Sequence, residues 1–392
     1  MKVVHIATSL NGGGAQYMLY RLLKFLNPGI ESEVISLHNV GMIGELLREI
    51  GVPVTALGMA RGKVDIGRII RLKSLLKQKR PDLVHTWMYH SDLIGGIAAR
   101  WAGVPRILWS LHVGDPNSGK RMTILVARAS ATLSRFIPDH IVSVSRKTEE
   151  AHLTFGYRCK HLSVIPGGYD FSAFRPDPDA RRQMRAELGI GDETLAVGLV
   201  TRYDPVKGHR DFLRAAKVVL PSHPKAIFVM AGRGVDASNA ELTGWIAELG
   251  LGNSVRLLGP SNDVPRMVNG LDLLVSASTV EAGPLIIGEA LSCGVPCVGT
   301  DLGLTADLIG DTGLVTPPGN ADALAAAICR MLDISDDERR ALGMRGRQRI
   351  IENFGIQTMA RAYEKLYEQL VTAGFARQAE RSRPVNRSSS EI

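Results

Sequence analysis

Two glutamates at the ends of an apolar segment raise the first chemical question. Glu281 and Glu289 lie eight residues apart in the stretch STVEAGPLIIGEAL. Burying a carboxylate without a partner is costly, so both side chains are expected to face an opening. Carboxylates accept hydrogen bonds, and adjacent hydroxyls are what a sugar ring and a ribose present. The simpler alternatives are a charge that complements a helix dipole for Glu281 and a solvated helix face for Glu289.

Two cations of unlike geometry form a second candidate group. Arg202 and Lys207 lie five residues apart in VGLVTRYDPVKGHRDF, in a loop that Gly208 closes just past a predicted strand. An arginine forks onto two oxygens and a lysine supplies a point charge, so together they suit a diphosphate. Ordinary surface charge is the alternative, and the position at a strand end disfavours it.

A glycine-rich turn, NGGGAQ, separates the first predicted strand from the first helix. Its glycines leave backbone amides bare beside a helix N-terminus, where an anion is stabilised. The turn does not fit a dinucleotide fingerprint, because Tyr17 stands where the third glycine is required. An NAD-dependent oxidoreductase is further disfavoured by His38, which ends the second strand where an acid is expected. A turn that simply needs positive φ is the alternative.

Short apolar strands alternate with amphipathic helices along most of the chain. Strands are predicted at Val3–Ala7, Val34–Leu37, Val54–Leu57, Leu83–Thr86, Ile107–Ser110, His140–Val144, Ala196–Val200, Ile227–Ala231, Val255–Leu258, Leu273–Ser276 and Pro296–Thr300. This alternation indicates parallel sheets with helices on both faces. We therefore predict an α/β fold with two Rossmann-like doubly wound domains, residues 1–175 and 196–355, which face each other across a ligand-binding cleft.

The remaining segments connect or extend these domains. Residues 176–195 are rich in proline and charge and are predicted to be a linker that leads into a polar helix. Residues 356–372 form one more amphipathic helix, and residues 373–392, rich in arginine and serine, are predicted to be disordered. The DPD string at 177–179 lies in the linker and not after a strand, so it is not interpreted as a metal-binding motif.

Local signals also place the two glutamates. A strand that ends at Ser276 is followed by a turn, and Pro284 suits the first position of a helix. Glu281 therefore precedes this helix and Glu289 lies inside it. The turn allows both carboxylates to face one cleft.

Composition and charge narrow the class of protein. The chain has 392 residues, of which 45% are hydrophobic, and it carries a formal net charge of +8. This is typical of a soluble two-domain protein, and the N-terminus lacks the apolar length of a signal peptide, so a cytoplasmic location is expected. The four cysteines are too few and too scattered for a disulfide framework or a zinc site, and no metal or cofactor is predicted.

A basic amphipathic helix is predicted between Ala60 and Arg80. Its basic residues are Arg61, Lys63, Arg68, Arg71, Lys73, Lys77, Lys79 and Arg80. Two interpretations are open: a solvated face over a packed stripe, or peripheral contact with an anionic membrane surface. A nucleic-acid partner is disfavoured, because aromatic residues make up only 5% and no groove-reading motif is present.

A nucleotide, a diphosphate and a sugar in one cleft describe an activated sugar donor, and here the sequence resembles a known family. It is similar to glycosyltransferase family 4, the retaining transferases with the two-domain GT-B fold, over residues 1 to 372. The matching stretches include GGAQ, VIPGGYDFSAFRP, TRYDPVKGH, MAGRG, RLLGPSNDV, EAGPLIIGEALSCGVPCVGTD and GDTGLVTPPGN. The helix from Gln357 to Leu370 resembles the family's closing helix, which crosses back to the first domain.

The resemblance implies roles for the residues that could carry the reaction. Glu281 would hold the hydroxyls of the donor sugar, and Glu289 those of the ribose. Arg202 and Lys207 would bind the diphosphate and stabilise the leaving group as negative charge accumulates. His112, which ends ILWSLH in the first domain, would face the donor sugar across the cleft.

The resemblance also implies a set of donor-binding residues that line the cleft. Near the phosphates these are Gly13 and Gly14 on the acceptor side and, from the second domain, Gly283, Pro284 and Leu285. The wall around the base would be formed by Arg233, Gly234, Leu258 and Gly259.

The expected reaction is transfer of a hexose from a nucleotide diphosphate to a hydroxyl acceptor, with the anomeric configuration kept. The acceptor would be a glycan or a lipid-linked glycan in surface polysaccharide assembly, and the basic helix suggests the inner membrane face. Two alternatives use the same fold: a sugar-nucleotide epimerase or hydrolase, and a non-catalytic protein that binds nucleotide sugars.

Overall fold

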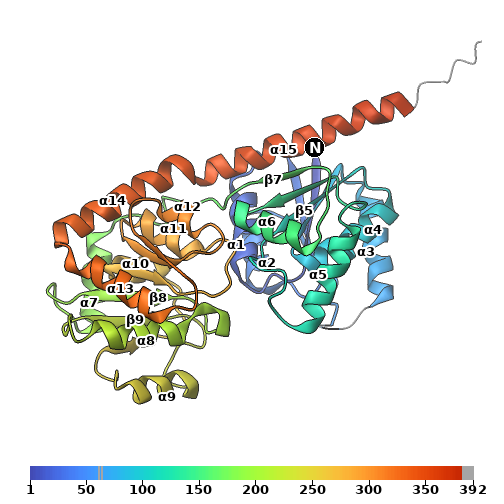
Figure 1. Ribbon diagram of the computed structural model, residues 1–392. Coiled ribbons are helices and arrows are strands. Elements are labelled where there is room, and N and C mark those ends of the chain that lie inside the picture. Colours follow the sequence, from blue (N-terminus) through green and yellow to red (C-terminus); the bar gives the residue numbers. More distant parts are fainter. Residues whose placement is uncertain (61, 63–64, 382–392) are drawn as a thin grey trace, which may run out of the picture.

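The chain folds into two α/β domains, each built on one parallel sheet (Figure 1). The computed structural model describes residues 1–60, 62 and 65–381. The first sheet has seven strands in the order β3-β2-β1-β4-β5-β6-β7, and the second has six in the order β10-β9-β8-β11-β12-β13. In both, the chain moves outward from the central strands in one direction and then in the other, which makes the sheets doubly wound. The predicted fold class is confirmed.

The first domain places helices on both faces of its sheet. Its strands are β1 (Lys2–Ala7), β2 (Glu31–Ser36), β3 (Val54–Ala56), β4 (Leu83–Trp87), β5 (Arg106–Leu111), β6 (His140–Ser143) and β7 (Leu162–Val164). Its helices are α1 (Gly14–Phe25), α2 (Gly41–Glu49), α3 (Ile66–Lys79), α4 (Tyr89–Ala102), α5 (Arg121–Leu133) and α6 (Arg146–Phe155). Successive strand residues bury on opposite faces: Val3 packs with α1 and α2, whereas Val4 packs with α3 and α4.

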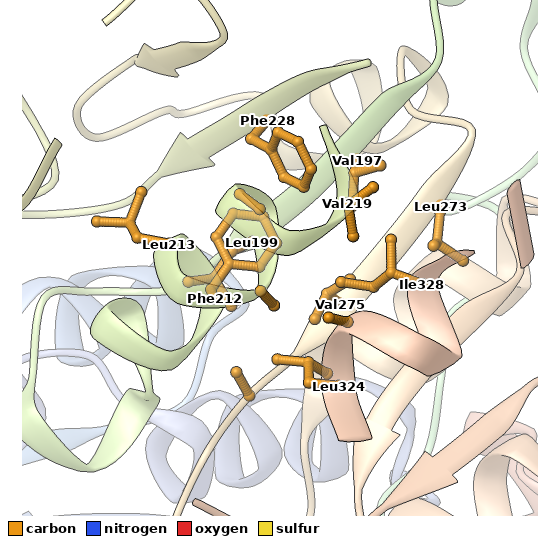
Figure 2. Close-up of a cluster of buried hydrophobic side chains, with 14 of the residues drawn as sticks. Val197, Leu199, Phe212, Leu213, Val219, Phe228, Leu273, Val275, Leu324 and Ile328 are labelled. Carbon is orange, nitrogen blue, oxygen red and sulfur yellow. The ribbon is translucent and has the colours of Figure 1, made fainter. Parts of the chain in front are cut away.

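The second domain repeats this plan around its own core. Its strands are β8 (Ala196–Val200), β9 (Ile227–Ala231), β10 (Val255–Leu257), β11 (Leu273–Ser276), β12 (Cys297–Thr300) and β13 (Leu314–Thr316). Its helices are α7 (Pro178–Leu188), the one-turn 3₁₀ helix η1 (Pro205–Lys207), α8 (His209–Val219), α9 (Ala240–Leu249), α10 (Val264–Asn269), α11 (Leu285–Ser292), α12 (Thr305–Ile309), α13 (Ala321–Asp333) and α14 (Asp336–Asn353). Figure 2 shows Phe212 of α8 and Ile328 of α13 packed with Val197 of β8 and Phe228 of β9.

The structure corrects the predicted linker. Within residues 176–195, Pro178–Leu188 form α7, which packs against α10. Its Arg181 and Arg185 both pair with Asp272 at the start of β11. Most of the segment therefore belongs to the second domain. The proline and charge that suggested a linker instead start the helix, because Asp177 caps it and Pro178 occupies its first turn.

The sequence analysis did not predict the two strands β7 and β13. β7 and β13 have only three residues each and lie at the edges of their sheets, where their side chains are mostly half-buried. β3 and β10 are equally short edge strands, but their segments were predicted. Pro284 also lies one position earlier than predicted, at the N-cap of α11 rather than inside the helix.

One long helix, α15 (Ile356–Arg381), crosses from the second domain back to the first, as predicted (Figure 1). Its aromatic side chains enter the core of the first domain, where the Tyr367 hydroxyl lies 2.8 Å from Nδ1 of His85. The helix continues through residues 373–381, which the sequence analysis assigned to a disordered tail, so that assignment is wrong for this segment. The rest of the predicted tail lies outside the described residues.

Candidate functional site

Two loops meet at the carboxyl ends of the adjacent strands β8 and β11. The backbone amide of Thr279 donates to the carbonyl of Val206 over 2.8 Å, which joins the loop after β8 to the loop after β11. A Cβ at Gly208 would lie 1.9 Å from the carbonyl oxygen of Ala277, and its φ is +68°. Only glycine fits this junction, because any side chain would push the loops apart.

This junction brings a predicted phosphate-binding cation against a predicted sugar-binding carboxylate. Lys207 Nζ lies 2.6 Å from Oε2 of Glu281, and the two side chains are 16% and 15% exposed. Arg202 lies in the same loop with a half-exposed side chain, and its Nη2 is 2.8 Å from Oδ2 of Asp204. Both cations therefore lie beyond the end of β8, where the sequence analysis placed them.

The four residues predicted to surround the base lie at the ends of the neighbouring strands β9 and β10. The Tyr203 amide donates to the Arg233 carbonyl over 2.8 Å, and the Gly232 amide donates to the Gly259 carbonyl over 2.8 Å. Leu258 is 36% exposed beside them. The backbone bonds between strand ends thus gather Arg233, Gly234, Leu258 and Gly259 next to Arg202, along one edge of the second sheet.

The first domain contributes His112, which follows β5. Its ring stacks on Trp87 with centroids 5.0 Å apart and an interplanar angle of 17°. Burial lowers the pKa of His112 to about 4, so the ring is neutral at pH 7. Its Nε2 is buried and has no hydrogen-bond partner within the described chain.

The loop that follows His112 touches the glutamate of the second domain. A Cβ on Gly114 would lie 2.1 Å from the carbonyl oxygen of Glu281. Nearby, Lys147 of α6 forms an ion pair with Asp301, which follows β12. The domains are therefore in direct contact at this edge, and His112 and Glu281 are brought to opposite sides of one boundary.

The phosphate-side residues predicted in the second domain also lie along this boundary. Gly13 is the N-cap of α1 and Gly14 is its first residue. A Cβ on Gly283 would contact Val144 of the first domain at 3.9 Å, and a Cβ on Gly167 would lie 3.8 Å from the Leu285 side chain. Pro284 lies between them, so the start of α11 faces the first domain.

Glu289 lies inside α11 as predicted, but it has a partner that the sequence analysis missed. Its Oε1 pairs with Nη2 of Arg21 on α1, in the first domain. The phenol of Tyr169 has its pKa raised first by burial and then by the charge of Glu289, while Arg21 opposes this and Glu281 adds to it. Both glutamates therefore lie within electrostatic reach of one phenol. The only signal for Arg21 was a cation among the apolar residues of α1.

Two surface hollows lie away from this boundary. One, of about 740 Å³, is lined by residues of α5 and α6 together with Asp115 and Asn117, and the other, of about 710 Å³, lies beside α8. Neither hollow is lined by a predicted site residue, so the candidate site is identified by its converging charged groups and not by the volume of a hollow.

Within the described parts of the chain, no group of three His, Cys, Asp or Glu residues is arranged to hold a metal ion. No helix among these residues is both long and apolar enough to cross a membrane.

Both domains of the chain match known protein families. Residues 12–173 match the family described as Glycosyltransferase Family 4, and residues 180–349 match Glycosyl transferases group 1. The UDP-Gal:alpha-D-GlcNAc-diphosphoundecaprenol alpha-1,3-galactosyltransferase of Escherichia coli is 27% identical over 313 residues, which are 78% of this chain and 80% of that protein. The lipopolysaccharide core biosynthesis mannosyltransferase LpsB of Rhizobium meliloti is 31% identical over 218 residues, which are 53% of this chain and 61% of that protein.

Solved structures share the same two-domain architecture. Anabaena Alr3699/HepE, determined in complex with UDP and glucose, superposes with a TM-score of 0.82 at 21% identity, over 94% of this chain and 100% of that one. Sucrose-phosphate synthase from Thermosynechococcus elongatus gives a TM-score of 0.77 at 19% identity, over 95% of this chain and 100% of that one. The two family matches, which together span residues 12–173 and 180–349, identify the chain as a member of glycosyltransferase family 4, and its fold is the GT-B fold.

Proposed function

We propose that this glycosyltransferase moves a hexose from a nucleotide diphosphate to a hydroxyl of a glycan or lipid-linked glycan, with retention of the anomeric configuration. The observation that carries the proposal is the convergence of Lys207 with Glu281, opposite His112. A cation and a hydroxyl-accepting carboxylate in contact are what a sugar diphosphate requires at the bond to be broken. UDP is the nucleotide we expect, since it is named for the Escherichia coli relative and is bound in the Anabaena structure.

The proposed mechanism assigns one task to each group. Glu281 accepts hydrogen bonds from the hydroxyls of the donor sugar and orients its anomeric carbon. As the bond from that carbon to the phosphate oxygen breaks, Lys207 and Arg202 stabilise the charge on the diphosphate. The acceptor oxygen bonds to the same face of the carbon, and its proton passes to the departing phosphate oxygen. His112 remains neutral and donates or accepts a hydrogen bond without repelling the developing positive charge.

Substitution of the paired residues tests this assignment. Lys207→Ala and Glu281→Gln should each lower kcat by at least about 100-fold, because each removes a charge that acts on the transition state. Lys225→Ala, at an exposed lysine away from the cleft, is the matched control. Wild-type rates in both cleft variants, at unchanged thermal stability, would contradict the proposed roles.

Product analysis separates the remaining alternatives. NMR of the product gives the configuration at the anomeric carbon, and an inverted product would exclude the retaining mechanism. Release of free sugar without an acceptor would indicate a hydrolase, and a new nucleotide sugar would indicate an epimerase. Donor binding without turnover, across a panel of glycan and lipid-linked acceptors, would support a non-catalytic protein.

We further propose that the acceptor is lipid-linked and that the enzyme meets it at an anionic membrane surface. The acceptor named for the Escherichia coli relative is a diphosphoundecaprenol-linked sugar. In this chain, α4 packs between α3 and α5, and this three-helix layer exposes large apolar side chains. We call it the α3–α5 face; these side chains are Ile66, Ile70, Trp101, Met122 and Leu125, which are 51% to 69% exposed.

The charge on the α3–α5 face suits anionic lipid. Lys73 lies 5.6 Å from the Trp101 ring centroid, and Arg71 and Arg80 are exposed on or beside the same helix. An apolar surface with basic residues around it is typical of helices that lie on anionic membranes. Asp65 caps α3, and Arg61 and Lys63 of the predicted basic helix lie outside the described residues.

Sedimentation with vesicles tests the membrane contact. The wild type should sediment with vesicles containing phosphatidylglycerol but not with pure phosphatidylcholine, and the double variant Ile70→Glu/Trp101→Glu should remain in solution. Met344→Glu, at a 51% exposed methionine of the second domain, is the matched control. Equal sedimentation with both lipids, or no loss in the double variant, would contradict the proposed contact.

A further inference from the structure

The ion pair between Arg21 and Glu289 joins the two domains through residues 268 positions apart in the sequence. Both side chains are only 11% exposed. A buried arginine is stabilised only when its donors are satisfied, and here the partner is the carboxylate for which we predict ribose binding. Arg21 thus touches the predicted donor site from the opposite domain.

The guanidinium of Arg21 is held by more than the glutamate. Its Nη1 lies 3.5 Å from the carbonyl oxygen of Gly168, and its central carbon lies 5.9 Å from the ring centroid of Phe174. Gly168 and Phe174 belong to the connection between the first domain and α7. Because the planar fork is fixed on several sides, it can set the orientation of the carboxylate that it binds.

This arrangement leaves part of the carboxylate available. Arg21 occupies Oε1 of Glu289, and within the described part of the chain Oε2 accepts no hydrogen bond. A carboxylate held by one oxygen presents the other in a fixed direction, as ribose hydroxyls require. The pair also lessens an electrostatic conflict, because two glutamates in a site for an anionic diphosphate would repel it. Lys207 offsets Glu281, and Arg21 offsets Glu289.

We propose that Arg21 is a positioning residue for donor recognition, which holds Glu289 so that its free oxygen accepts hydrogen bonds from the ribose of the nucleotide. The inference rests on the proposed function, since the ribose belongs to the nucleotide-sugar donor. The competing explanation is an ion pair that only joins the domains. The two differ in one respect: only a positioning residue affects how well the protein distinguishes a nucleotide with ribose hydroxyls from one without them.

Calorimetric titration of the full chain with UDP and with 2′,3′-dideoxy-UDP measures this discrimination directly, and GDP with its dideoxy analogue serves as a second pair. The wild type should bind the ribonucleotide more tightly. The discrimination ratio is the dissociation constant of the dideoxy nucleotide divided by that of the ribonucleotide. Arg21→Met should reduce this ratio by about tenfold, which is the effect of losing a well-oriented hydrogen bond to a charged group. Arg21→Lys should restore part of the ratio, because it keeps the charge but not the fork.

A matched control and a second background make the result specific. Arg347 also lies near this junction, where its Nη1 bonds the carbonyl oxygens of Phe174 and Ser292 and not Glu289. Arg347→Met should leave the ratio unchanged. In the Glu289→Gln background, Arg21→Met should have little further effect on the ratio, because Arg21 acts through the carboxylate.

Each outcome bears on a different claim. If Arg21→Met weakens the binding of both nucleotides equally and keeps the wild-type ratio, Arg21 only joins the domains. The inference is then overturned, while the proposed function stands. If Arg21→Met binds both like the wild type, the inference is overturned as well. If the wild type binds neither pair, or binds each dideoxy analogue as tightly as the ribonucleotide, the proposed donor site itself fails and the inference fails with it.

Discussion

Individual residues at the cleft owe their chemistry to burial as much as to type. His112 is neutral because burial lowers its pKa to about 4, and the same cause lowers the pKa of His5 to about 3 and that of His85 well below its ordinary value. His5 and His85 are fully buried on β1 and β4, and Nε2 of His85 lies 2.5 Å from the Ser110 hydroxyl. Burial also lowers the pKa values of His140 and His152 to about 4, so the domain folds with at least five histidines held uncharged.

Because these histidines are neutral in the folded state, we expect the free energy of unfolding to fall at acidic pH. Their folded pKa values are lower than the unfolded value near 6.5, so the unfolded chain takes up more protons between pH 6.5 and 4. The stabilisation is complete above pH 6.5 and is lost as the pH falls towards 4. From pH 7.5 to 5.5 each histidine should lower the free energy of unfolding by about 1.4 kcal/mol.

Urea unfolding at these two pH values measures the effect. Replacing His112 by Gln should reduce the difference by one histidine's share, because one titrating group is removed. Equal stability of the wild type at pH 7.5 and 5.5 would contradict the buried neutral state.

At the scale of elements, α15 depends on contacts with a domain far from it in sequence. Tyr367 is fully buried, and its hydroxyl lies 2.8 Å from Nδ1 of His85 on β4 of the first domain. The backbone carbonyl of Leu370 accepts a bond from Nε of Arg106 over 2.9 Å, and Glu364 accepts one from the Asn27 amide over 2.7 Å. The helix therefore packs against the first domain and completes its hydrophobic core.

Graded substitutions at Tyr367 separate the parts of this contact. Tyr367→Phe should lower the free energy of unfolding by about 1 kcal/mol, since it removes only the hydrogen bond to His85. Tyr367→Ala should lower it by about 3 to 5 kcal/mol, because it also leaves a cavity in the core. Thermal and urea unfolding provide the measurement, and equal effects of the two substitutions would show that the ring contributes nothing.

At the scale of the whole molecule, the two domains approach each other most closely where the predicted chemistry lies. Gly114 has no room for a side chain against the backbone of Glu281, and the Lys147–Asp301 and Arg21–Glu289 pairs link the domains on either side. Under the proposed function, this closeness would bring first-domain groups to a donor held by the second domain and would exclude water from the reacting atoms. Turnover should therefore depend on the domains reaching this arrangement.

Gly114→Ala tests that dependence. The added Cβ meets backbone atoms, which cannot move aside, so the domains should remain further apart. We expect kcat to fall at least about tenfold while thermal stability changes little, because the substitution hinders the approach of the domains and not the folding of either one. Small-angle scattering should show a larger radius of gyration. Gly191→Ala, where a Cβ meets nothing within 4 Å, is the control, and a wild-type kcat in Gly114→Ala would refute the requirement.

The sequence by itself determined the architecture and the second-domain residues of the site. The buried strands of both sheets have apolar runs with local turn signals, and Arg202, Lys207 and Glu281 follow such strands directly, so their place at the sheet edge could be predicted. The edge strands β7 and β13 were missed, although β3 and β10, which also have three residues each at a sheet edge, were predicted. Proline and charge likewise mark a helix start as readily as a linker, which is why the polar helix α7 was expected but was not assigned to the second domain.

Only the tertiary structure decided which residues from distant segments meet. Nothing local to Arg21 points to Glu289, and nothing near Gly114 points to Glu281. The burial that keeps His112 neutral likewise involves a neighbour on another strand, Trp87 of β4. Local sequence specifies conformation over a few residues, whereas pairing between domains depends on how two finished surfaces fit. The sequence therefore predicted the types of chemical group, whereas the tertiary structure determined which of these groups are in contact.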